Sequence, residues 1–92
     1  MIVHELTESE CLDVLSRASV GRLACAREGQ PYIVPISFYF DGTASLYSFS
    51  TVGQKIQWMR ENPKVCLEVD DVVDRFHWRS VIVNGTFAEM NA

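Results

Sequence analysis

Two hydroxyls, a glycine and a lysine lie together in one short stretch of this 92-residue chain, residues 50–55 (Ser-Thr-Val-Gly-Gln-Lys). The stretch leads into an amphipathic segment, residues 53–61, that predicts a short helix ending before Pro63. A helix N-terminus offers unpaired N–H donors and a partial positive charge, and Lys55 adds a full one. The residues therefore indicate a phosphate site. The plain alternative is that Thr51 caps the helix and Lys55 is a solvated surface charge.

Two kinds of element must position this turn. The first 18 residues predict a helix, because Thr7 and Glu10 have the spacing of a capping box and Gly21 ends the segment. Its apolar positions, at helical spacing, are Cys11, Leu12, Val14, Leu15 and Ala18.

The remaining segments predict strands, over residues 20–27, 32–40, 45–50, 65–69 and 78–88. Asp41-Gly42 is a hairpin signal, and residues 70–75 are expected to form a polar loop. Pro35 removes a ladder donor, so its strand is expected at an edge, at a bulge or facing a ligand. The fold class is therefore mostly β with α, on the border of all-β and α+β, with an N-terminal and an inserted helix. Five antiparallel strands leave two edges exposed unless the sheet closes or dimerises.

Composition excludes several classes of protein. A net charge of −4 and a pI near 5.0 argue against nucleic acid as the main partner. No apolar run approaches the roughly 20 residues of a membrane helix, so we expect a single cytoplasmic domain spanning residues 1–92 and no membrane partner. Three cysteines are odd in number and lack metal-ligand spacing, which favours reduced thiols and no metal site: Cys11, Cys25 and Cys66.

No catalytic acid, base or nucleophile can be assigned. His4 and His77 have no carboxylate partner at motif spacing, and no Ser-His-Asp or Cys-His set is present. Asp70, Asp71 and Asp74 lack the glycine and spacing of a calcium loop.

Five segments in order resemble one family: residues 29–32 (Gly-Gln-Pro-Tyr), 34–37 (Val-Pro-Ile-Ser), 47–55 (Tyr-Ser-Phe-Ser-Thr-Val-Gly-Gln-Lys), 62–65 (Asn-Pro-Lys-Val) and 78–85 (Trp-Arg-Ser-Val-Ile-Val-Asn-Gly). They resemble the FMN-binding split-barrel proteins and are most similar to the pyridoxamine 5'-phosphate oxidase-like flavoproteins, including the nitroimidazole-resistance branch. The resemblance runs from about residue 20 to residue 90. It implies an antiparallel split β-barrel homodimer that binds FMN in two symmetric clefts at the subunit interface.

The resemblance also implies roles for individual residues. The strand matching residues 34–38 would run beside the isoalloxazine ring. Ser48 and Phe49 would lie near the ribityl chain and the ring, and Ser50, Thr51, Gln54 and Lys55 would hold the phosphate. The start of the last strand would approach the ring, from the same subunit or its partner. The implied cofactor-binding residues are Val34, Pro35, Ile36, Ser37, Ser48, Phe49, Ser50, Thr51, Gln54, Lys55, Trp78 and Ser80. The structural alternatives are an edge-strand irregularity at Pro35 and a core or interface aromatic at Trp78.

The chain departs from the family pattern at two places. The oxidases carry Arg-Lys where this chain has Gln54-Lys55, so a second cation would have to come from Arg22, Arg60 or Arg79. Family members also continue past position 92 into another strand, and the oxidases grip their substrate's phosphate with basic residues located there. This argues against pyridoxamine phosphate oxidase activity and predicts a short form or a truncated product.

Three functional hypotheses follow. The first is an FMN-dependent oxidoreductase with an unknown small-molecule acceptor. The second is a non-catalytic module that stores or senses flavin or binds a deazaflavin, haem or pyridoxal phosphate. The third is a chain that binds nothing and persists as a dimerised sheet.

Overall fold

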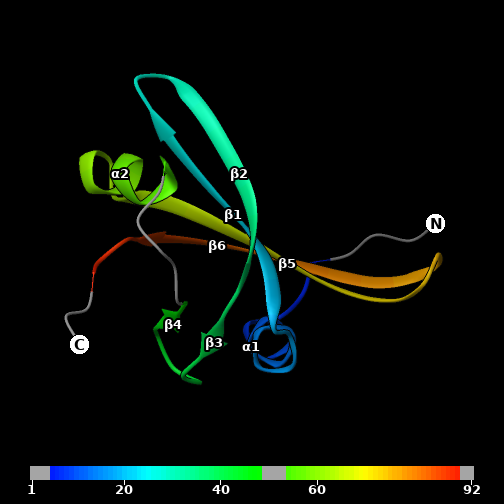
Figure 1. Ribbon diagram of the computed structural model, residues 1–92. Helices are drawn as coiled ribbons and strands as arrows, with labels where there is room; N and C mark the ends of the chain where they lie inside the picture. The colour runs from blue at the N-terminus through cyan, green and yellow to red at the C-terminus, as the bar shows by residue number, and fades with distance from the viewer. Residues whose placement is uncertain (1–4, 49–53, 90–92) are drawn as a thin grey trace.

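The computed structural model describes residues 5–48 and 54–89. In chain order its elements are α1 (Glu8–Arg17), β1 (Val20–Arg27), β2 (Gln30–Ser37), β3 (Tyr39–Phe40), β4 (Leu46–Tyr47), α2 (Gln54–Glu61), β5 (Lys64–Asp74) and β6 (His77–Thr86) (Figure 1). Four strands form one antiparallel sheet in the order β2-β1-β5-β6, and β3 pairs with β4 in a separate ribbon. The expectation of a mostly β fold with two helices is confirmed.

The predicted capping box starts α1. The Glu10 N–H donates to Thr7 Oγ1 at 3.2 Å, and the Thr7 N–H donates to Glu10 Oε1 at 3.0 Å, which satisfies donors that a helix start leaves open. The helix ends at Arg17, and Gly21, predicted to end the segment, lies inside β1. Neither helix among the described residues is long and apolar enough to cross a membrane.

The core lies where α1 covers one face of the sheet. Its buried side chains come from the helix, from the two long strands and from the residue between β2 and β3: Val14, Leu15, Phe38, Leu67, Val69 and Val81. Because successive strand residues alternate between faces, the buried residues of β5 are two apart. The second helix, α2, packs against β1.

Two strand predictions were wrong in their extent. The expected loop at residues 70–75 is mostly strand, since β5 continues to Asp74 and β6 begins at His77, giving a long hairpin that projects from the body (Figure 1). The polar residues tolerate this because they pair across the hairpin, as Asp71 does with Arg79 at 2.7 Å. The predicted strand 32–40 breaks at Phe38, whose N–H donates to the Ser19 carbonyl at 2.9 Å while its side chain is buried.

The strand expected over residues 45–50 is short, because β4 holds only Leu46–Tyr47, and residues 49–50 lie outside the described residues. The chain therefore has six strands in its described part, where five were expected. The edge position predicted from Pro35 is confirmed, since β2 is the outer strand beside β1.

Candidate functional site

One face of the four-stranded sheet is left uncovered by both helices. Residues paired directly across antiparallel strands share a face, so the register defines this surface, which we call the open face. Its members include Val20, Arg22, Ile33, Pro35, Ser37, Glu68, Asp70, Val72, Trp78, Ser80 and Ile82. Ile33, Val72 and Ile82 are about two-thirds exposed, at 67%, 65% and 65%. So much exposed apolar surface on one side of a sheet marks a binding or assembly face.

Four of the residues predicted to bind the cofactor lie on the open face. Pro35 is opposite Arg22, Ser37 is opposite Val20, and the pairs Asp70–Ser80 and Val72–Trp78 continue the surface across β5 and β6. Trp78 is half exposed, which excludes the alternative that it is a core residue of this chain. The remaining alternative, an interface aromatic, is compatible with this place.

Other predicted residues lie elsewhere. Val34 and Ile36 belong to the opposite side of β2, where Ile36 lines a cavity. Ser48 donates from its Oγ to the Ser37 carbonyl at 2.7 Å and so joins the end of β4 to the end of β2. Phe49, Ser50 and Thr51 lie outside the described residues, and Gln54 and Lys55 begin α2 without a described side chain.

The open face has a charged centre that the sequence did not reveal. Arg22 Nη1 donates to Asp70 Oδ2 at 3.4 Å, and Glu68 shares a hydrogen bond with the Asp70 carboxyl. That hydrogen bond, with partial burial and the charge of Asp70, raises the pKa of Glu68, while Arg22 opposes the rise. Glu68 and Asp70 are two apart in β5 and share a face, but the sequence analysis predicted a loop from residue 70. Arg22 is 48 residues from Asp70, so their pairing could not be predicted from the sequence.

β2 adds backbone groups to the same region. As the edge strand of the described sheet, it presents N–H and C=O groups along its outer side that none of the described strands uses. Pro35 lacks an N–H and interrupts the row of donors. A planar heteroaromatic ring beside this edge would meet apolar surface, main-chain donors and acceptors, and a cation with a carboxylate pair.

A cavity of about 500 Å³ lies on the other side of the sheet. It is bounded by the β3–β4 ribbon, α2 and the end of β6, and its walls include Ile36, Phe38, Met59 and Val83. The polar residues that line it are Ser45, Tyr47, Ser48, Asn84 and Thr86, and none of the described residues that line it is charged. The described part of these walls suits an apolar ring.

The three arginines considered as a second phosphate cation all bind carboxylates. Arg22 is paired on the open face as described above, and Arg60 Nη2 donates to Glu89 Oε2 at 3.0 Å near the end of α2. Arg79 is opposite Asp71 on the covered face of the sheet. In the described part of the chain, none of them is held beside the start of α2.

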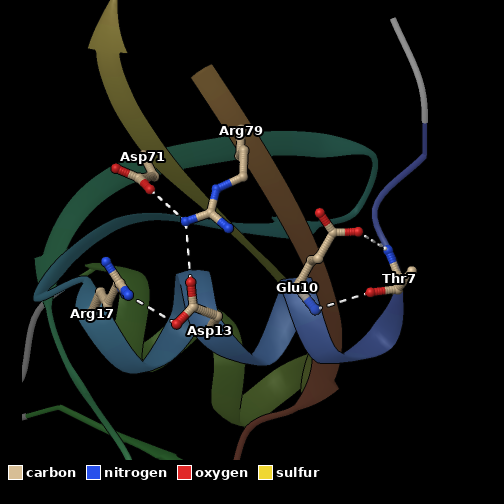
Figure 2. A network of polar contacts seen from close by, with 6 residues as sticks. All are labelled: Thr7, Glu10, Asp13, Arg17, Asp71 and Arg79. Carbon is tan, nitrogen blue, oxygen red and sulfur yellow. Dashed lines mark hydrogen bonds and ion pairs between the residues drawn. The ribbon is translucent and has the colours of Figure 1, made fainter. Parts of the chain in front are cut away.

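Arg79 instead fixes α1 to the sheet. Its Nη2 donates to Asp71 at 2.7 Å and to Asp13 at 3.2 Å, and Asp13 also accepts from Arg17 Nε at 3.0 Å (Figure 2). The hydrogen bond from Arg17, with a further one from Arg79, holds the pKa of Asp13 below its ordinary value. Arg79 therefore has a structural role in joining α1 to the sheet and is not a candidate ligand residue.

The histidine that follows the β5–β6 turn is also explained by local structure. Asp74 Oδ1 accepts from the N–H groups of Phe76 and His77 at 2.8 and 2.9 Å, and its carboxylate contacts His77 Nδ1 at 2.9 Å. Elsewhere in residues 5–48 and 54–89, no group of three His, Cys, Asp or Glu side chains is arranged to hold a metal ion.

Comparison with known proteins places this geometry in context. A family profile described as pyridoxamine 5'-phosphate oxidase matches residues 7–92. The chain is 46% identical to a FAD-binding protein from Mesorhizobium loti whose crystal structure matches with a TM-score of 0.94, covering 99% of this chain and 65% of that one. A FAD-binding protein from Mycobacterium smegmatis matches with a TM-score of 0.76 at 29% identity, covering 91% of this chain and 71% of that one.

A curated relative, an uncharacterized protein from Rhizobium meliloti, is 45% identical over all 92 residues of this chain. The chain spans 60% of the length of that relative. The match therefore does not assign the activity, substrates or partners of the longer proteins to this chain.

Proposed function

Because the chain belongs to the pyridoxamine 5'-phosphate oxidase family, we propose that it is a flavin-binding redox protein. The family match, the antiparallel sheet and its two helices confirm the predicted split-barrel fold. The observation that carries the proposal is the near-complete match, at 46% identity, to a protein named as FAD-binding.

The proposed place of the isoalloxazine ring is the outer edge of β2 together with the open face. There Pro35 and Ser37 lie at the edge, with Ser80 and Trp78 further across the same surface. The hydroxyls of Ser50 and Thr51 and the ammonium of Lys55 would hold the phosphate nearest the ring, with Ser48 and Phe49 beside the ribityl chain. Val34 and Ile36 would support the ring's strand from behind.

The proposal includes a homodimer that covers the open face. An isologous interface must be complementary to itself, and this face carries a cation, Arg22, beside two carboxyls, Glu68 and Asp70. Two copies related by a two-fold axis can set Arg22 of each against the carboxyls of the other. The exposed apolar side chains around this centre would then be removed from water.

Bound flavin supplies hydride and single-electron transfer, so no nucleophile is required of the protein. The chain's own contribution would be to orient the ring with main-chain groups of β2. The FMN predicted from sequence and the FAD named for both solved neighbours share the ring, the ribityl chain and the first phosphate. The electron acceptor in this proposal is a small molecule, and a cytoplasmic setting accords with three cysteines, all described, that form no disulfide with one another.

The second candidate function is storage or sensing of the same cofactor. The observation that favours it is Gln54 where the oxidases have a cation, together with the carboxylate partners of the three arginines that could replace it. Oxidation of NAD(P)H by the flavin-loaded protein separates the two candidates. Sustained turnover supports the oxidoreductase, and a loaded protein without turnover supports storage or sensing.

The variant Lys55→Ala tests the phosphate part of the proposal. Loss of a charge-assisted hydrogen bond, worth about 1.5–3 kcal/mol, should weaken FMN binding roughly 10- to 150-fold in titration calorimetry. Lys64→Ala is the matched control, because Lys64 is an exposed lysine at the start of β5 and not part of the proposed site. Equal affinity in Lys55→Ala and wild-type protein would remove Lys55 from the site.

A further inference from the structure

Two tyrosines lie opposite each other on the β3–β4 ribbon. Tyr39 pairs with Tyr47, and Phe40 pairs with Leu46, in antiparallel register. Phe40 and Leu46 pack against the core, so alternation turns both tyrosines to the outer side. Tyr39 is 69% exposed and Tyr47 is 42% exposed. Two neighbouring aromatic rings are thus offered to solvent, with Cβ atoms about 5 Å apart by the geometry of paired strands.

The ribbon beneath these rings is firmly tied. Asp41 Oδ1 accepts from the N–H groups of Thr43, Ala44 and Ser45 at 2.9 to 3.1 Å, and the Asp41 N–H donates to the Ser45 carbonyl at 3.0 Å. The apolar pair on the inner side anchors the ribbon to the core. A platform of this kind is preorganised, so a ligand that stacks on it loses little free energy in ordering the protein.

The platform lies close to the proposed phosphate residues along the chain. Tyr47 precedes Ser50 by three residues, a span of at most about 10 Å. A ligand whose phosphate is held at residues 50–55 could therefore place a further aromatic group on the ribbon.

We propose that the Tyr39–Tyr47 pair binds the adenine ring of a dinucleotide flavin and so makes the protein select FAD over FMN. The inference rests on the proposed flavin binding and adds to it the adenylate half of the ligand. FMN ends at the first phosphate, whereas FAD continues through a second phosphate and a ribose to adenine. Adenine has a π-face that stacks on aromatic side chains without needing base-specific hydrogen bonds.

The test compares both flavins on the apoprotein by titration calorimetry. Base stacking on aromatic side chains predicts that wild-type protein binds FAD about 5- to 150-fold more tightly than FMN. The double variant Tyr39→Ala/Tyr47→Ala should lose this preference while its FMN affinity stays unchanged. The double variant Tyr39→Phe/Tyr47→Phe keeps the rings and should keep most of the preference.

Two further measurements make the result specific. Adenosine monophosphate should displace FAD but not FMN from wild-type protein, and should not bind the double alanine variant. Phe76→Ala, which removes an exposed aromatic ring from the β5–β6 turn, should leave both flavin affinities unchanged. Circular dichroism of each variant checks that the fold is kept.

The outcomes distinguish failure of the adenine platform from failure of the proposed flavin binding. Equal affinity of wild-type protein for FAD and FMN, or an equal loss for both flavins in the double alanine variant, would overturn the adenine platform and leave flavin binding standing. Wild-type protein that binds neither flavin would overturn both. A double alanine variant that loses only its self-association would show that the pair is an interface between copies of this chain, which also overturns the inference.

Discussion

Gly21 of β1 lies close against β5, and its replacement by alanine tests the sheet that carries the open face. A Cβ at this position would lie 2.9 Å from the Glu68 carbonyl oxygen, 3.0 Å from Leu67 Cδ1 and 3.2 Å from Val69 Cγ2. The carbonyl is main chain, and Leu67 and Val69 are buried, so none of these neighbours can move cheaply.

The size of the effect follows from two opposing contributions. Overpacking of this kind costs about 1–3 kcal/mol, and the smaller conformational entropy of unfolded alanine returns about 0.4–1 kcal/mol. We therefore expect Gly21→Ala to lower the free energy of unfolding by about 1–2 kcal/mol. In a domain of this size that corresponds to a fall of roughly 4–15 °C in Tm.

Gly85→Ala is the matched control, because Gly85 is also a strand glycine and a Cβ there would have no neighbour within 4 Å. Urea unfolding of both variants, followed by circular dichroism, measures the difference. We expect Gly85→Ala to be as stable as wild-type protein or slightly more so. A Gly21→Ala variant as stable as Gly85→Ala would refute the close approach of β1 to β5, and with it the register that sets Arg22 beside Glu68.

Three further predictions concern charged side chains. The N–H groups of Thr43 and Ser45 lower the pKa of Asp41 to about 2. The ionised Asp41 therefore stabilises the fold above about pH 4, and this stabilisation is lost as the pH falls towards 2. The fall in urea midpoint between pH 4 and pH 2 should be smaller in Asp41→Asn than in wild-type protein. The hydrogen bond with Asp70 raises the pKa of Glu68, so ionising Glu68 costs the folded state more as the pH rises above about 4.5. Glu68→Gln should therefore have the higher urea midpoint at pH 7, with the gap closing near pH 4. Arg79→Met should speed amide hydrogen exchange in α1 more than Arg17→Met does. The exposed Arg17 pairs with Asp13 of the same helix, whereas Arg79 links α1 to β5, so equal exchange in the two variants would contradict that role of Arg79.

Local signals predicted the elements whose causes are local. Thr7 and Glu10 are three residues apart, and their reciprocal hydrogen bonds start α1 where the sequence placed it. Alternation predicted β1 over Val20–Arg27 with the bounds that the structure has. Pro35 predicted a strand at an edge, at a bulge or facing a ligand, because it lacks an N–H, and the structure shows the edge position.

The misses have tertiary causes. The break at Phe38 depends on a hydrogen bond to Ser19 and on burial beneath α1, neither of which a strand pattern carries. The polar run at residues 70–75 was interpreted as a loop because it lacks an apolar face. It stays in the ladder because Asp71 meets Arg79, a pairing that only the hairpin register creates.

The candidate site could be predicted only in part, because strand pairing brings some of its residues together. The sequence motifs indicated which residues belong together chemically, and the register places Pro35, Ser37, Ser80 and Trp78 on one face. The sequence did not show that Arg22, Glu68 and Asp70 form the charged centre of that face, since these residues meet only when β1 and β5 pair. Nor did it show the outward tyrosine pair, because both rings lie on strands of only two residues.

The central claim is that this chain binds flavin, and the absorbance spectrum of the protein as purified tests it most directly. Mass analysis of the small molecule released on denaturation then identifies the ligand. The account predicts a yellow protein with flavin absorbance bands that releases FAD, one molecule per chain. A colourless protein that also takes up neither FAD nor FMN when they are added would contradict it.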